Sequence, residues 1–187
     1  MKPSKAGRSR NSRMKLNEVY FWTDTIKEWK KLLIQDKYKQ LIMNQLKWLK
    51  DKNKIIVYGF VIMPNHLLLI WEMVENNGKE MPHASFNKWT SSNFLKDLRA
   101  NHPKVVPFFK ERTIERNHRF WQRDPLAILM DSREKVEQKL NYIHLNPLQE
   151  RWNLVGLPED YRWSSAKFYD SGEDEFCVLT HYSDRFG

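Results

Sequence analysis

The stretch from residue 55 to residue 71 constrains the fold of this chain more than any other. Residues 55–63 are almost all β-branched, aromatic or aliphatic, which indicates a strand buried on both faces. Pro64 and Asn65 interrupt this run, because proline cannot donate to a strand ladder and asparagine tolerates turn conformations. The residues that follow are apolar again. The stretch therefore predicts two strands joined by a tight corner, with His66 at the corner, where a side chain can face a cleft.

The remaining segments complete a mixed α and β pattern. The expected elements are a strand over 18–26, helices over 36–51 and 86–101, a short strand over 126–130, and a helix that opens at Asp131 and ends near Pro147. The order is strand, helix, strand, strand, helix, strand, helix. This order predicts an α+β fold, a ferredoxin-like or RNA-recognition-motif-like antiparallel sheet of four to five strands with helices packed on one face. Because many functions use this fold, it does not decide the function.

The charge and aromatic content favour a polyanionic partner. Lys and Arg number 32 against 23 Asp and Glu, so the net charge is +9, and the chain holds 8 Trp, 7 Tyr and 10 Phe. Cations with aromatic rings are typical of proteins that bind single strands, with an anionic membrane surface as the second possibility. A basic domain with an aromatic core explains the composition equally well. The single cysteine, Cys177, excludes an intrachain disulfide.

No apolar run is long enough to span a bilayer, and no secretory signal is visible. We therefore expect a cytoplasmic, nucleoid-associated protein without a membrane partner. Residues 1–16 are expected to form a disordered basic arm, and residues 17–187 a single domain. The irregular segment 102–124 interleaves rings with cations. Its candidates for nucleic-acid contact are Lys110, Arg112, Arg116, Arg119, Trp121 and Arg123. A solvated tail and a loop anchored by aromatic side chains are the alternatives.

Four short motifs together carry a resemblance to a known family. They are Met-Pro-Asn-His-Leu-Leu-Leu-Ile-Trp at 63–71, Phe-Trp-Gln-Arg-Asp-Pro at 120–125, Asn-Tyr-Ile-His-Leu-Asn-Pro at 141–147 and Asp-Tyr-Arg-Trp-Ser-Ser-Ala at 160–166. In this order they resemble the REP-associated branch of the single-tyrosine HUH transposases, over roughly residues 17–182. The resemblance implies the HUH endonuclease fold. It implies a metal-dependent enzyme that cleaves and rejoins single-stranded or hairpin DNA through a 5′-phosphotyrosine intermediate, acting as a monomer or homodimer.

The same resemblance implies the site residues. Tyr142 matches the nucleophile, and His66 and Asn146 match two ligands of a Mg²⁺ or Mn²⁺ ion. The family has a second histidine two residues after the first, and this chain has Leu68 there. Side chains two apart on a strand share a face, so the ion loses one protein ligand that water must replace. We therefore expect weak metal binding and reduced or absent cleavage.

Three hypotheses about function remain open from the sequence. The chain is a working transposase, a descendant that binds structured single strands without cleaving them, or an RNA-binding module of the recognition-motif type. His66 as a structural residue at a turn, Tyr142 as a core aromatic and Asn146 as a helix cap are the plain alternatives. The nuclease hypotheses require His66 and Tyr142 to lie on the same side of the sheet, with the phenol not buried among aliphatic side chains.

Overall fold

The predicted hairpin is present as β2 (Ile55–Ile62) and β3 (His66–Met73). A computed structural model describes residues 14–111, 118–123 and 125–187. β3 also pairs antiparallel with β1 (Val19–Thr25), whose other edge pairs with β4 (Leu126–Leu129). The strand order is therefore β2-β3-β1-β4. This order confirms the α+β, ferredoxin-like antiparallel sheet, with four strands in the described ranges.

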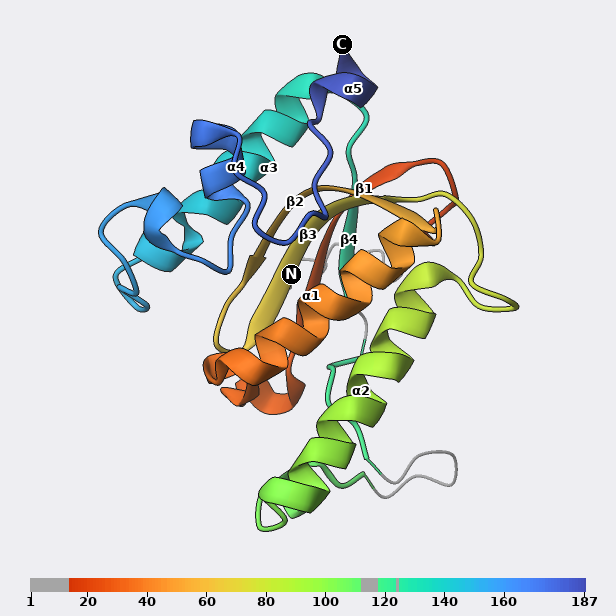
Figure 1. Cartoon of the computed structure of the whole chain (residues 1–187), viewed down its shortest axis with the longest axis vertical. Helices are drawn as coiled ribbons and strands as arrows, with labels where there is room; N and C mark the ends of the chain where they lie inside the picture. The colour runs from red at the N-terminus through yellow and green to blue at the C-terminus, as the bar shows by residue number, and fades with distance from the viewer. Residues whose placement is uncertain (1–13, 112–117, 124) are drawn as a thin grey trace, which may run out of the picture.

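Helices α1 (Asp36–Asp51) and α2 (Pro82–Asn101) cover one face of the sheet (Figure 1). The indole rings of Trp22 and Trp71 stack on this face with centroids 5.0 Å apart, and Phe86 of α2 meets both edge-on. α2 begins four residues before the predicted start, because Pro82 suits the first turn of a helix, where its missing N–H is not needed. These three aromatic side chains are fully buried between α2 and the sheet.

Helix α3 (Arg133–Leu145) covers the other face, so the expectation that all helices lie on one face is wrong for this element. α3 crosses β2 at Gly59, where a Cβ atom would lie 2.4 Å from a methyl carbon of Leu140. The helix begins after Ser132, whose hydroxyl accepts from the Lys135 amide at 3.4 Å, and not after Asp131 as predicted. It ends before Pro147, as expected, in the 3₁₀ turn η4 (Asn146–Leu148).

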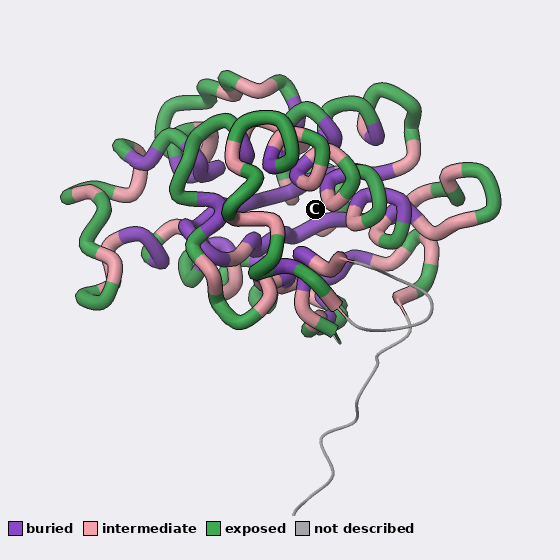
Figure 2. The backbone as a smooth tube through the Cα atoms, turned by 90° about the horizontal axis from the view of Figure 1, so that it is seen from below, coloured by how far each residue is buried: buried purple, intermediate pink, exposed green. Residues whose placement is uncertain are grey.

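The C-terminal segment packs along the β2 edge and over α3. It contains η5 (Pro158–Asp160), α4 (Ala166–Ser171) and α5 (Ser183–Phe186). The Phe60 amide donates to the Ser165 hydroxyl at 3.0 Å, and Arg185 pairs with the buried Glu72 at 3.2 Å. The strands therefore run through the middle of the molecule, where Figure 2 shows most of the buried backbone.

Three further 3₁₀ turns connect the main elements. They are η1 (Lys27–Trp29), η2 (Leu32–Ile34) and η3 (Val106–Phe109). η1 and η2 join β1 to α1, and η3 lies between α2 and β4. Within the described ranges, no helix combines the length and apolar character that crossing a bilayer requires.

Candidate active site

His66 is the first residue of β3, directly after the corner that joins the two hairpin strands. Its Nδ1 lies 2.7 Å from the Asn65 Oδ1, so Nδ1 carries the proton and Nε2 keeps its lone pair. Burial, with a smaller contribution from the Arg151 charge, lowers the pKa of His66 to about 4. The imidazole is therefore neutral at physiological pH, which is the form that binds metals and accepts hydrogen bonds.

Asn146 supplies a second polar side chain to the same place. Its side chain is 0% exposed, and neither amide atom has a hydrogen-bond partner among the described residues. The amide raises the pKa of His66 against the effect of burial, so the two side chains act on each other. A buried amide without partners is costly, by about 1–3 kcal/mol, unless something absent from the chain itself satisfies it. The Oδ1 atom lies close enough to His66 to affect its pKa, and a hard cation or a bound water would satisfy it.

Strand register places Tyr142 on the same face of the sheet as His66. His66, Leu68 and Ile70 alternate onto one face of β3, and Phe21 of β1 lies directly opposite Ile70. The Tyr142 ring meets the Phe21 ring edge-on, with centroids 6.1 Å apart and planes at 75°. The phenol is 42% exposed. The requirement that the imidazole and the phenol share a face is met, and Tyr142 is not a core aromatic.

Leu68 lies on this face between them and is 2% exposed. It pairs with Thr23 on one side and Val61 on the other, so its side chain belongs to the packed layer under α3. Among the residues that the structure describes, no three histidine, cysteine or acidic side chains gather as a metal site. The imidazole and the orphaned amide oxygen fit two positions of a Mg²⁺ or Mn²⁺ ion, and water must fill the others.

Lys139 is a site residue that the sequence motifs did not indicate. Its ammonium lies 4.8 Å from the Phe21 ring centroid and 5.6 Å from that of Tyr142. The two α3 residues are three apart, so they are neighbours on the helix surface. A helical plot could have found this spacing, because Tyr142 and Lys139 both fall outside the apolar stripe of α3. The cation places positive charge beside the phenol.

The other side of His66 is aromatic and basic. The Trp152 ring centroid lies 6.0 Å from that of His66. The charged ends of Lys31 and Arg151 lie 5.9 and 5.7 Å from the same Trp152 ring. Trp152 is partly buried and packs against the core. No motif pointed to Lys31 or Arg151, which are distant in sequence and meet only in the fold.

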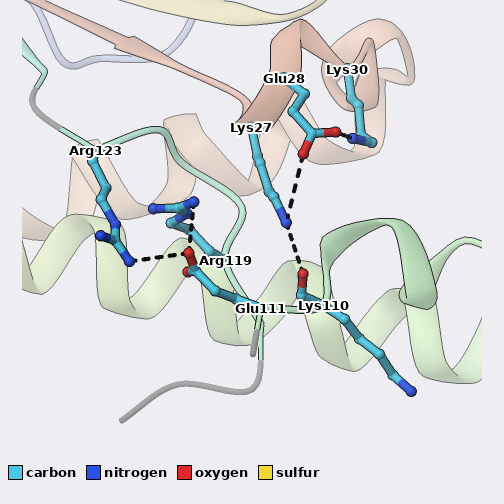
Figure 3. Close-up of polar contacts among 7 residues, drawn as sticks. All are labelled: Lys27, Glu28, Lys30, Lys110, Glu111, Arg119 and Arg123. Carbon is cyan, nitrogen blue, oxygen red and sulfur yellow. Dashed lines mark hydrogen bonds and ion pairs between the residues drawn. The ribbon is translucent and has the colours of Figure 1, made fainter. Parts of the chain in front are cut away.

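The predicted contact segment divides into three groups. Arg112 and Arg116 lie outside the described residues. Lys110 is exposed, and Arg119 and Arg123 both pair with Glu111, at 2.7 and 3.2 Å (Figure 3). Trp121 is 4% exposed and its indole N–H donates to Thr90 at 2.9 Å. The prediction of a base contact by Trp121 is wrong, because its ring packs between α2 and the sheet.

The fold and the site together define a class: a ferredoxin-like sheet with an imidazole, an amide and a phenol on one face. No family model matches the sequence, and no curated protein matches it. A solved structure of a REP-associated tyrosine transposase bound to a REP hairpin matches the fold, with a TM-score of 0.59 and 15% sequence identity. The match covers 93% of this chain and 90% of that one. The similarity confirms the fold that the four motifs implied.

Proposed function

We propose that this chain is a transposase-like protein that binds hairpin-bearing single-stranded DNA and cleaves and rejoins it through Tyr142. Residues 17–187 would form its single catalytic domain. The observation that carries the proposal is the placement of Tyr142, His66 and Asn146 on one face, with the Asn146 amide buried and without a partner. The fold shared with a transposase that binds a REP hairpin supports it.

The chemistry that we propose is attack by the Tyr142 hydroxyl on a backbone phosphorus atom. The new P–O bond to the phenol forms as the P–O3′ bond breaks, and the phenolic proton is transferred in the net reaction to the leaving 3′ oxygen. The products are a 5′-phosphotyrosine and a free 3′ hydroxyl. Attack by a 3′ hydroxyl reverses the step, so the phosphodiester bond energy is kept and strands can be exchanged.

The residues around Tyr142 have separate roles in this proposal. Lys139 holds positive charge beside the phenol, which attracts the scissile phosphate. His66 Nε2 and Asn146 Oδ1 would hold a Mg²⁺ or Mn²⁺ ion, and Asn65 fixes the imidazole that binds it. Such an ion, when bound, polarises a phosphate oxygen and stabilises the charge that develops on the leaving group.

A covalent adduct assay tests the proposal. The substrate is a pool of hairpin-bearing single strands with randomised flanks, labelled at the 3′ end, because the fragment that stays on the protein carries that end. With Mn²⁺ or Mg²⁺ we expect a labelled band on a denaturing gel that is lost in Tyr142→Phe. Tyr182→Phe is the matched control, because Tyr182 bonds Glu137 of α3 and lies outside the proposed site.

Hairpin binding by Tyr142→Phe is measured by fluorescence anisotropy. Binding that is retained shows that the variant is folded and that only the cleavage reaction is lost. An adduct that persists in Tyr142→Phe would exclude Tyr142 as the nucleophile. The second candidate function is a binding protein without cleavage, and one observation favours it: a buried leucine, Leu68, stands where the resemblance implies a second histidine ligand. That function predicts hairpin binding with no adduct for any member of the pool.

A further inference from the structure

Trp29 is a large aromatic side chain that projects from the surface beside the His66 corner. It is 68% exposed, more than any other large apolar residue in the described ranges. Glu28 and Trp29 both have left-handed backbone conformations, with φ of 55° and 53°. Each such residue costs on the order of 1–2 kcal/mol when it is not glycine. The chain therefore holds an exposed indole in a strained turn, η1, that the surrounding contacts must stabilise.

Those contacts connect the turn to the candidate active site. The Trp29 amide donates to the Ile26 carbonyl at 2.9 Å, and the Asn65 side-chain amide donates to the Trp29 carbonyl at 3.3 Å. The oxygen of the same Asn65 side chain accepts from His66 at 2.7 Å. One amide group thus fixes both the Trp29 backbone and the His66 ring. Asn65 is therefore a direct link between the residue that carries the indole and the residue that carries the imidazole.

The surroundings of Trp29 are cationic. Lys27 and Lys30 lie on either side of it in the sequence, and both form ion pairs with Glu28. Figure 3 shows Lys27 reaching toward Lys110. Lys27 is anchored by donating to the Lys110 carbonyl at 2.8 Å. Across the corner, Lys31 lies near the Trp152 ring, which itself lies beside His66. Exposed rings between cations suit unpaired bases joined by phosphates.

We propose that the Trp29 indole is a stacking surface for an unpaired base of single-stranded DNA that passes the His66 corner. The inference rests on the proposed function and adds to it the position of the flanking strand. Stacking is tolerant of sequence because every base has an aromatic face. The strand passes from Trp29 over the corner toward Tyr142, and the exposed Lys31 contacts its phosphates. Trp29 is a binding residue and takes no part in bond breaking.

The test compares two hairpins that differ only in a single-stranded flank, with binding measured by anisotropy in a Tyr142→Phe background. Trp29→Ala should weaken binding of the flanked hairpin by roughly 5- to 150-fold and leave the blunt hairpin unchanged. Trp29→Phe should restore most of the loss. Trp48→Ala is the matched control, because Trp48 is also exposed, at 45%, but lies on α1, on the other face of the sheet.

An abasic nucleotide identifies the stacked base. The abasic nucleotide is placed at each position of the flank in turn. At one position it should weaken binding as much as Trp29→Ala does. At that position it should not weaken the binding of the Trp29→Ala variant any further. Three results for Trp29→Ala would overturn the inference. They are an unchanged DNA affinity, an equal loss of affinity for the blunt hairpin, and a change in oligomeric state in place of a loss of DNA affinity. Because cleavage is disabled, these results do not depend on the adduct assay. Failure of that assay alone removes the nuclease proposal and leaves Trp29 as a binding residue.

Discussion

A single asparagine, Asn65, organises the chemistry of the corner. Its side chain accepts from His66 Nδ1 and donates to the Trp29 carbonyl, so it fixes the tautomer of one residue and the backbone of another. Asn146 approaches the other side of the imidazole with no partner of its own among the described residues. Leu68 occupies the position at which the resemblance implies a further ligand.

Leu68→His tests whether the absence of an imidazole at position 68 limits metal binding. The substitution buries a polar ring where the side chain is 2% exposed, which should lower stability by about 1–3 kcal/mol without metal. Mn²⁺ at a hundred times its Kd should raise the free energy of unfolding of this variant by about 2.7 kcal/mol, because only the folded state has the site. Thermal unfolding with and without Mn²⁺ measures both effects, and adduct yield should rise in parallel.

Leu67→His is the control for this prediction. Leu67 is equally buried and adjacent in sequence, but its side chain points to the opposite face, toward α1 and α2. It should lose stability without gaining any dependence on Mn²⁺. If Leu68→His binds Mn²⁺ no better than the unmodified chain, Leu68 does not occupy a ligand position.

Helix α3 is the element that brings the phenol and the amide to the sheet. It carries Tyr142 in its last turn and is followed immediately by Asn146 in η4. Its distance from the sheet is set at Gly59, because any side chain there would meet Leu140. The glycine is needed for close approach, and no unusual backbone angle is involved. A small displacement of α3 would move both site residues together.

Gly59→Ala should therefore affect stability and the site at once. We expect a loss of about 1–3 kcal/mol in the free energy of unfolding, measured by urea denaturation, and a lower adduct yield. Gly59→Ala combined with Leu140→Ala should cost less than the sum of the single changes, because the second change removes the clash. Gly156→Ala, where nothing lies within 4 Å of the added carbon, should stay within about 0.5 kcal/mol. Additive losses would show that the clash is not the cause.

Across the whole molecule, the net charge of +9 favours phosphate binding, and the fold decides which cations remain available. Arg119 and Arg123 share Glu111, while the Lys110 side chain extends away from that group (Figure 3). Cations that already have acidic partners contribute less to a polyanion site. Lys110 is therefore a better candidate for a phosphate contact than Arg119 or Arg123.

Salt dependence tests this distinction. The logarithm of the affinity for a hairpin with a single-stranded flank should fall linearly with the logarithm of salt concentration. Lys110→Gln should reduce the slope by about 0.7 if Lys110 contacts one phosphate of the single-stranded part. Lys47→Gln should leave the slope unchanged, because Lys47 pairs with Asp51 on α1 at 3.0 Å. An equal change in the two variants would indicate only a general effect of net charge.

The element order, the hairpin and the end of α3 could be predicted because their causes are local. Alternation in β1, the unbroken apolar run of β2 and the position of Pro147 depend on neighbours in sequence. The resemblance carried by the four motifs also predicted that His66, Tyr142 and Asn146 belong to one site. Trp121 shows the limit of this reasoning, because an aromatic ring among cations has the same sequence pattern whether it is exposed or packed against Thr90.

The sequence by itself determined which residue types were available and which short segments would form strands or helices, since periodicity and turn chemistry act over a few residues. Only the tertiary structure decided that α3 lies on the face opposite α1 and α2, that Asn146 lacks a partner, and that Trp29 stands beside His66. These facts depend on strand register and on contacts between distant segments. The free energy that selects them comes from burying the whole core at once, which no single segment encodes.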